Sequence, residues 1–264
     1  MDLQLRGKRV LVTGSTAGIG WAIARELATE GAAVIINGRD AERLGLAVER
    51  LYAAIPGAEV IAVLADVGTA EGCAHLAEAA GTVDILVNNC GIFDPRPFEQ
   101  IDDVQWQHFF DVNVMSGVRL SRALLPAMKA RNWGRIVFIS SESGICPPAE
   151  MVHYGMTKSA QLSVSRGLAE TCAGTGVTVN AVLPGPTRTE GTGKFFAERA
   201  RDTGQTLEDA ERAFFTHARP TSLLKRFIEP AEVAAMVAYV CSPRASATNG
   251  AALRVEGGVV RSLI

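Results

Sequence analysis

The sequence has no excess of charge of either sign and no long apolar run, and these absences exclude several classes of protein. Its 26 basic and 28 acidic residues leave a formal net charge of −2, so nothing favours binding to nucleic acid. No segment approaches the roughly 20 apolar residues that a membrane span needs. Residues 1–8 carry charges without an apolar run, so no signal peptide is expected. We expect a cytoplasmic protein that binds neither nucleic acid nor membrane.

Cysteine is sparse and follows no recognisable spacing. The chain has five cysteines and four histidines, with no Cys-x-x-Cys pair and no zinc-ligand spacing. We therefore expect free thiols in a reducing compartment and no metal site.

Short apolar segments alternate with segments of helical periodicity along the chain. The expected strands are 10–13, 33–36, 60–64, 85–87, 136–139, 177–182 and 253–255. Helical patterns occupy 19–30, 40–54, 69–80, 102–131, 153–173 and 229–241. Short, fully apolar strands between helices are typical of a parallel sheet covered on both faces. The pattern predicts an α/β, Rossmann-type doubly wound fold with about seven parallel strands.

No linker, repeat or change of composition divides the chain, so one domain over 1–264 is expected. The least regular segment is 191–227, which carries two Phe-Phe pairs among charged residues. It follows the sixth expected strand, where a lid over a pocket at the sheet edge would emerge. We predict that 191–227 is a substrate-binding lid.

A glycine-rich turn joins the first expected strand to the first expected helix, with the sequence Thr-Gly-Ser-Thr-Ala-Gly-Ile-Gly. Residues without a Cβ let the backbone approach a pyrophosphate, and the helix N-terminus offers free N–H groups. A purely structural turn is the alternative, but strand, spacing and helix together favour dinucleotide binding. The residues expected to contact the dinucleotide here are Gly14, Ser15, Thr16, Gly18, Ile19 and Gly20.

This turn resembles the Thr-Gly-x-x-x-Gly-Ile-Gly fingerprint of the short-chain dehydrogenase/reductase family, with every fixed position present. The resemblance runs from Lys8 to about Gly258 and is to single-domain members like the 3-oxoacyl-(acyl-carrier-protein) reductases. It implies an oxidoreductase that moves a hydride between a nicotinamide and a carbonyl or secondary alcohol. One departure is Val-Glu-Gly-Gly at 255–258, where the family usually has Val-Asp-Gly-Gly.

The residue after the second strand bears on the choice of cofactor. An acidic residue there would bind a ribose 2′-hydroxyl, whereas Arg39 offers donors to a 2′-phosphate. Ser15 could add a hydroxyl to the same phosphate, and Asp40 is expected to cap the next helix. NADP(H) is preferred and NAD(H) stays possible, because no basic residue directly precedes Gly18 and Arg39 could be a solvated loop residue.

Further cofactor contacts are implied by the resemblance. Asp66 and Val67 follow the third strand, where the family's Asp accepts from the adenine amine; a cap for the helix near Thr69 is the alternative. Asn89 and Gly91 belong to Asn-Asn-Cys-Gly, which looks like the family's cofactor-lining Asn-Asn-Ala-Gly.

The segment after the sixth strand is similar to the family's Pro-Gly segment, which wraps the nicotinamide. Its expected contacts are Pro184, Gly185, Thr187 and Thr189. By this match the Thr187 backbone meets the carboxamide and the Thr189 side chain reaches amide or phosphate.

Four residues form the expected catalytic constellation: Asn113, Ser141, Tyr154 and Lys158. Tyr154 and Lys158 are four apart in a helix, so they share a face. A nearby ammonium is expected to lower the tyrosine pKa and make it an acid/base. The family resemblance implies that Lys158 also binds the nicotinamide ribose, that Ser141 donates to the substrate oxygen, and that Asn113 positions a water for proton relay.

The helix over 102–131 carries more apolar residues than one stripe requires. The family commonly pairs such long helices between subunits, so the resemblance implies a homotetramer, with a dimer second. A monomer with this helix fully buried is the alternative.

Three alternatives to an NADP(H)-dependent reductase are open. One is an NAD-dependent alcohol dehydrogenase of the same fold. Another is a sugar-nucleotide epimerase of the extended branch, which usually needs a longer chain and a differently spaced glycine motif. A third, a non-catalytic dinucleotide sensor, has no reason to keep Ser141, Tyr154 and Lys158. The substrate stays open among β-ketoacyl thioesters, cyclic ketones or steroids, and polyols.

Overall fold

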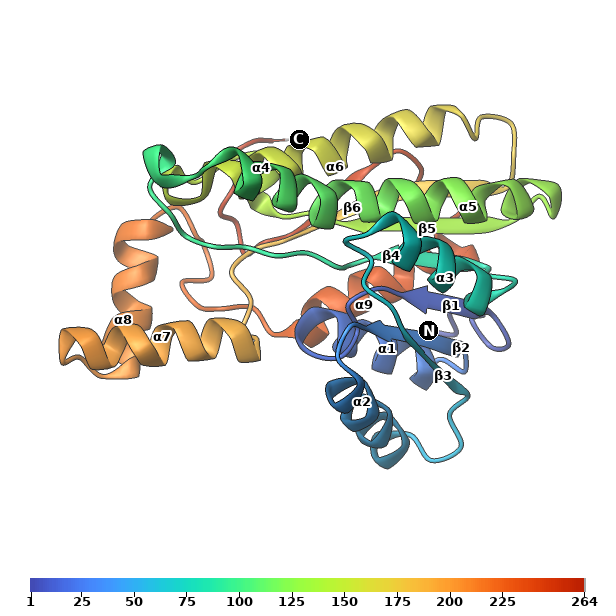
Figure 1. Cartoon of the computed structure of the whole chain (residues 1–264), viewed down its shortest axis with the longest axis horizontal. Helices are drawn as coiled ribbons and strands as arrows, with labels where there is room; N and C mark the ends of the chain where they lie inside the picture. The colour runs from blue at the N-terminus through green and yellow to red at the C-terminus, as the bar shows by residue number, and fades with distance from the viewer. Residues whose placement is uncertain (264) are drawn as a thin grey trace.

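The computed structural model describes residues 1–263, without the side chains of residues 199 and 203. Its centre is one sheet of seven parallel strands in the order β3-β2-β1-β4-β5-β6-β7 (Figure 1). The strands are β1 (Arg9–Val12), β2 (Ala33–Gly38), β3 (Val60–Leu64), β4 (Ile85–Asn88), β5 (Gly134–Ile139), β6 (Val177–Pro184) and β7 (Ala252–Val255). The doubly wound parallel sheet predicted from the sequence is confirmed.

Successive residues of each strand point to opposite faces of the sheet and build two cores. In β1, Val10 and Val12 pack under α1 (Gly18–Thr29), α2 (Ala41–Ala54) and α9 (Pro230–Cys241). Leu11 packs on the other face, under α3 (Ala70–Ala80), α5 (Ser116–Ala130) and α6 (Val152–Glu170). Because both faces are covered, the strands are mostly apolar rather than strictly alternating, with a few buried polar residues such as Asn37, Arg135 and Asn180.

The helical pattern over 102–131 is divided into α4 (Asp103–Phe110) and α5 by a π-helical turn, Asp111–Met115. Its apolar side chains are mostly buried within the chain, and Leu120 and Met128 are wholly so. The apolar residues beyond a single stripe are therefore mostly buried in the protein's own core. The turn places Asn113 where the helix passes the end of β4, and π-turns of this kind occur often at functional sites.

The segment expected to be irregular, 191–227, contains most of two helices that the sequence analysis did not predict. These are α7 (Glu190–Thr203) and α8 (Leu207–Ala213), followed by a π-helical turn, Phe214–Ala218. Two glycines and a highly charged face obscure the helical period in α7. A small aromatic cluster stabilises the segment instead; its buried members are Phe196, Ala200, Ala210, Phe215 and Phe227. Figure 1 shows α7 and α8 standing away from the sheet.

Two absences among the described residues follow. Within residues 1–263, no helix is long and apolar enough to cross a membrane. All five cysteines are free thiols, as expected, and the described side chains include no group of His, Cys, Asp and Glu suited to a metal ion.

Candidate active site

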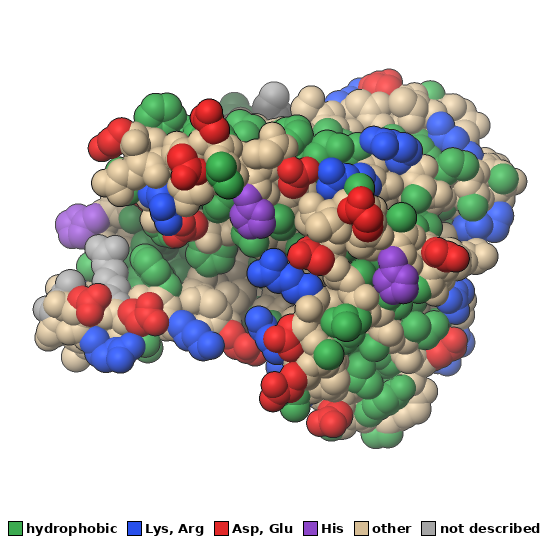
Figure 2. Space-filling view, in the orientation of Figure 1, with side chains coloured by type: hydrophobic (Ala, Val, Ile, Leu, Met, Phe, Trp, Pro, Cys, Tyr) green, Lys and Arg blue, Asp and Glu red, His purple; other side chains and the backbone are tan. Residues whose placement is uncertain are grey.

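A cavity of about 700 Å³ opens at the carboxyl ends of the strands, which is where open α/β sheets bind ligands. One end is lined by the glycine turn and the other by Ser141, Tyr154 and the aromatic side chains of 191–227. The hollow is visible in Figure 2 between the α7–α8 segment and the body of the molecule. One elongated site thus joins the dinucleotide motif to the catalytic motif.

The glycine turn fits a dinucleotide pyrophosphate on steric grounds. Gly14 and Gly18 have φ values of 59° and 54°, which L side chains rarely adopt. A Cβ on Gly20 would lie 2.4 Å from both the Gly14 carbonyl oxygen and Asn89 Nδ2. Helix α1 begins at Gly18 without a side-chain cap on its N–H groups. The backbone can therefore approach an anion closely while offering it unshielded donors.

One expected phosphate contact is wrong, because the Ser15 hydroxyl is wholly buried. Its Oγ donates to the Val12 carbonyl at 2.7 Å and accepts from the Asn37 N–H at 2.9 Å. Ser15 therefore ties β1 to β2. Arg39, in contrast, extends from the end of β2 with 66% of its side chain exposed, and its nearest ionic partner is Asp66 at 3.9 Å. Arg39 is therefore largely exposed at the end of β2.

Asp66 is not the cap of α3. Its Oδ1 accepts from the Gly68 N–H at 2.9 Å, whereas Thr69 caps the helix by accepting from Gly72. Asp66 is exposed beside Arg39 and Val67 is buried. Asp40 caps α2, as expected, by accepting from the Arg43 N–H.

Asn89 braces the glycine turn against β4. Its Nδ2 donates to the carbonyls of Thr13 and Gly14 at 2.9 and 3.1 Å. The neighbouring Cys90 fits here as a partly buried thiol whose pKa is raised by burial. A Cβ on Gly91 would lie 3.3 Å from Lys158 Nζ. The Asn-Asn-Cys-Gly segment thus connects the glycine turn to Lys158.

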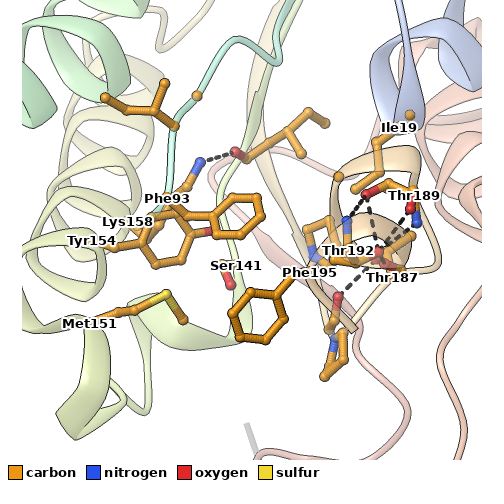
Figure 3. Close-up of a pocket in the computed structure, with 18 of the residues that line it drawn as sticks. Ile19, Phe93, Ser141, Met151, Tyr154, Lys158, Thr187, Thr189, Thr192 and Phe195 are labelled. Carbon is orange, nitrogen blue, oxygen red and sulfur yellow. Dashed lines mark hydrogen bonds between the residues drawn. The ribbon is translucent and has the colours of Figure 1, made fainter. Parts of the chain in front are cut away.

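Tyr154 and Lys158 lie one turn apart on α6, and Ser141 faces them from the end of β5 (Figure 3). Lys158 Nζ lies 5.5 Å from the centre of the Tyr154 ring and donates to the Ile139 carbonyl at 2.9 Å. Ser141 Oγ donates to Glu142 Oε2 at 2.5 Å and accepts from the Ser143 N–H. The three predicted side chains therefore meet at one end of the cavity.

The pKa of Tyr154 moves in the direction opposite to our expectation. Burial raises the pKa of its phenol, and the nearby Glu142 carboxylate raises it further. Burial also lowers the pKa of Lys158 to about 8. In this environment Tyr154 is a neutral hydroxyl, the form that donates a proton.

Asn113 is buried, and both polar atoms of its side chain have hydrogen-bond partners. Its Oδ1 accepts from the Ile92 N–H at 2.7 Å, and its Nδ2 donates to Thr157 Oγ1 at 2.9 Å. Gln161 connects it to the lysine: Gln161 Nε2 donates to the Asn113 carbonyl at 2.5 Å, and Gln161 Oε1 accepts from Lys158 Nζ at 3.2 Å. The sequence analysis missed Gln161, although its place three residues after Lys158 puts both on one helix face.

An ion-pair cluster at the mouth of the site was also missed. Glu142, only 5% exposed, pairs through Oε1 with Arg219 Nε at 3.3 Å. Arg219 Nη1 lies 3.1 Å from Glu150 Oε1. Arg219 and Glu142 are 77 residues apart, and no local pattern marks the pair.

The segment after β6 closes the far wall. A Cβ on Gly185 would lie 2.6 Å from the Glu256 carbonyl oxygen. Thr187 Oγ1 donates to the Gly185 carbonyl, and Thr189 caps α7 by accepting from the Thr192 N–H. Pro184, Gly185, Thr187 and Thr189 all line the cavity. The longer Glu256 is accommodated, since its Oε2 accepts from the N–H groups of Val259 and Val260.

Comparison with known proteins agrees with this geometry. The family model for short chain dehydrogenase matches residues 8–200. An uncharacterized oxidoreductase, YvaG, of Bacillus subtilis is 50% identical over the full length of both chains. The 3-oxoacyl-[acyl-carrier-protein] reductase FabG of Aquifex aeolicus is 33% identical, with 98% of this chain and 100% of the relative covered.

A solved structure has nearly the same fold. L-sorbose reductase from Gluconobacter frateurii, complexed with NADPH and L-sorbose, superimposes with a TM-score of 0.94 at 33% identity, covering 100% of both chains. The chain therefore belongs to the short-chain dehydrogenase/reductase family and is an oxidoreductase that acts on alcohol or carbonyl substrates with a nicotinamide cofactor.

Proposed function

We propose that this protein is an NADP(H)-dependent carbonyl reductase in which Tyr154 is the general acid. The observation that carries the proposal is one cavity lined by the glycine turn at one end and by Ser141, Tyr154 and Lys158 at the other. Tyr154 is protonated in this environment, which is the form that a general acid needs before it donates. An NAD-dependent alcohol dehydrogenase is the second candidate.

In the proposed reaction the bound nicotinamide supplies a hydride to the carbonyl carbon. The Ser141 hydroxyl holds the carbonyl oxygen in place and stabilises the negative charge that develops on it. Tyr154 donates its proton to that oxygen. The Lys158 ammonium stabilises the resulting phenolate and holds the ribose, while Asn113 and Gln161 orient the lysine.

The proposed cofactor site runs along the cavity and continues beyond it on the adenine side, because Thr16, Arg39, Asp66 and Val67 do not line the cavity. It comprises backbone groups at Gly14, Thr16, Gly18, Ile19 and Gly20, with Arg39 on a 2′-phosphate and Asp66 and Val67 near the adenine. Asn89 and Gly91 lie between the two ends, Tyr154 and Lys158 belong to the catalytic end, and Pro184, Gly185, Thr187 and Thr189 would hold the nicotinamide. Support for NADP(H) comes from the exposed Arg39 and from NADPH in the L-sorbose reductase complex.

We expect Arg39→Asp to reverse the cofactor preference. The change removes a guanidinium from a 2′-phosphate and adds a repelling carboxylate, so NADPH affinity should fall about 100-fold while NADH binding is kept or improved. Titration of cofactor fluorescence measures both affinities. Arg6→Asp, an exposed arginine far from the cavity, is the matched control. If the Arg39 variant binds NADPH as the wild type does, Arg39 is only a loop residue and NAD(H) becomes the leading cofactor.

The affinity for NADPH should also depend on pH. The lowered pKa means that Lys158 is an ammonium below about pH 8 and neutral above it. Raising the pH through this value removes a charged donor to the ribose, so the Kd should rise about tenfold. Lys158→Met should bind weakly with no such pH dependence. An equally steep rise in that variant would assign the titration to another group.

We further propose that residues 191–227 form a substrate lid over the single domain, that the protein is cytoplasmic, and that it assembles as a homotetramer, with a dimer second. The assembly rests on the family resemblance, because the apolar residues of α5 are largely buried within the chain. Light scattering coupled to size exclusion measures the oligomer directly. The relatives act on substrates as different as 3-oxoacyl thioesters and L-sorbose, so their names do not select one.

A further inference from the structure

Glu142 is the one buried carboxylate beside the proposed catalytic hydroxyls in the part of the chain that the structure describes. Its Oε2 accepts the hydrogen of Ser141 Oγ at 2.5 Å. Reduction requires Ser141 to turn that hydrogen toward the substrate oxygen. Glu142 Oε2 then loses its donor, although it stays next to the reacting carbonyl.

Glu142 has little freedom to find another donor. Its Oε1 is paired with Arg219 at 3.3 Å, and both side chains are nearly buried, with 7% and 11% of their surfaces exposed. Arg219 is held in turn by Glu150 and by the Ala218 carbonyl. The carboxylate is therefore fixed in the cavity wall, and an unsatisfied buried carboxylate oxygen is strongly unfavourable. A hydrogen-bond donor on the substrate, placed beside the reacting carbonyl, would restore the missing hydrogen bond.

We infer that the substrate is an α-hydroxy ketone, whose carbonyl oxygen meets Ser141 and whose neighbouring hydroxyl donates to Glu142 Oε2. The two oxygens of such a substrate sit on adjacent carbons, roughly 2.5–3.0 Å apart, which is also the separation of hydrogen-bonded oxygens. Ser141 Oγ and Glu142 Oε2 lie 2.5 Å apart, within this range. The Ser141 hydroxyl can therefore donate to the substrate carbonyl while Glu142 Oε2 accepts from the neighbouring substrate hydroxyl.

The reaction balances with the proposed cofactor. NADPH gives a hydride to the carbonyl carbon, Tyr154 gives a proton to the carbonyl oxygen, and the π electrons of the C=O bond form the new O–H bond. The products are a vicinal diol and NADP⁺, and solvent returns the proton to Tyr154. Glu142 exchanges no proton, so it is a specificity-determining residue.

Other substrate classes leave this carboxylate without a partner. A β-ketoacyl thioester or a simple cyclic ketone carries no hydrogen-bond donor on the carbon next to the reacting carbonyl. Binding either one would remove water from Glu142 Oε2 without supplying a new hydrogen bond, which is unfavourable. The aromatic walls supplied by Phe93, Phe195 and Phe214 can take the apolar remainder of a substrate.

The inference rests on the proposed function and is tested with three ketones and NADPH. The probes are 1-hydroxy-2-butanone, 3-pentanone, which replaces the hydroxyl by a methyl, and 1-methoxy-2-butanone, which keeps the electronegative oxygen but has no donor. The cavity of about 700 Å³ has room for all three. We expect kcat/KM for the hydroxy ketone to exceed both others by at least about tenfold, the size of one charge-assisted hydrogen bond.

The variant Glu142→Gln removes the charge at nearly constant shape. Its kcat/KM for the hydroxy ketone should fall to about the value for the methoxy ketone. Glu150→Gln is the matched control, because its carboxylate reaches Arg219 but not Ser141, and it should keep the preference. Equal rates for all three ketones with the wild type, or a preference that survives Glu142→Gln, would overturn the α-hydroxy ketone. If NADPH binds but no ketone is reduced, the proposed function itself fails. The wild-type comparison remains decisive if the variant does not fold.

Discussion

Replacing Tyr154 by Phe should lower kcat/KM for carbonyl reduction by about 10³-fold, within the range for loss of a general acid. The phenyl ring can keep its edge contact with Phe93, whose centroid lies 6.4 Å away, so the wall of the cavity should be preserved. Only the hydroxyl that donates to the substrate oxygen is lost. Steady-state kinetics with NADPH measures the loss, and a fluorescence titration should find cofactor affinity nearly unchanged.

Tyr239→Phe is the control for this prediction. Tyr239 lies on α9, is 39% exposed and does not line the cavity, so losing its hydroxyl should leave kcat/KM unaltered. Activity of the Tyr154 variant within about tenfold of wild type would be too high for a missing general acid. The proton would then have to come from another group, and Ser141 is the nearest alternative hydroxyl in the cavity.

Gly20→Ala is expected to abolish tight cofactor binding by displacing the glycine turn. The new methyl group would stand 2.4 Å from Asn89 Nδ2 and from the Gly14 carbonyl oxygen. These two groups are hydrogen-bonded to each other at 3.1 Å, so the methyl must separate them and displace the turn. We expect at least a 100-fold loss of NADPH affinity and a destabilisation of about 1–3 kcal/mol, typical of overpacking.

The matched control is Gly45→Ala in α2, where a Cβ meets nothing within 4 Å. Alanine in a helix interior should raise the free energy of unfolding there by about 0.5–1 kcal/mol without changing cofactor affinity. Thermal unfolding and NADPH titration of both variants distinguish a local effect at the turn from a general effect of adding a methyl group. Wild-type affinity in the Gly20 variant would contradict the close approach of backbone to pyrophosphate.

The sheet could be predicted from the sequence because its signals are local. Each strand is a short, mostly apolar run, and each expected run overlaps a strand of the sheet. The relation of Tyr154 to Lys158 could be predicted for the same reason, since helical spacing alone puts them on one face. Likewise Asp40 was recognised as a cap from its position before α2.

What escaped prediction depends on contacts between distant segments. Helix α7 owes its stability to Phe196 packing against Phe214 and Phe227, and not to a strong period of its own. The hydroxyl of Ser15 was assigned to a phosphate because its bond to Asn37, on the next strand, cannot be read from the turn. The raised pKa of Tyr154 depends on burial and on Glu142, which is held by the distant Arg219. Such effects exist only after the chain has folded.

The aromatic cluster beneath α7 and α8 is separate from the two cores that flank the sheet. The aromatic side chains that line the pocket therefore belong to a different part of the chain from the two cores of the sheet. A substitution among Phe195, Phe196 and Phe214 changes the shape of the pocket without opening a void beside the strands. The cost of such a substitution should therefore fall mainly on this segment and not on the packing of the sheet. One framework can in this way diversify into enzymes for unrelated ketones.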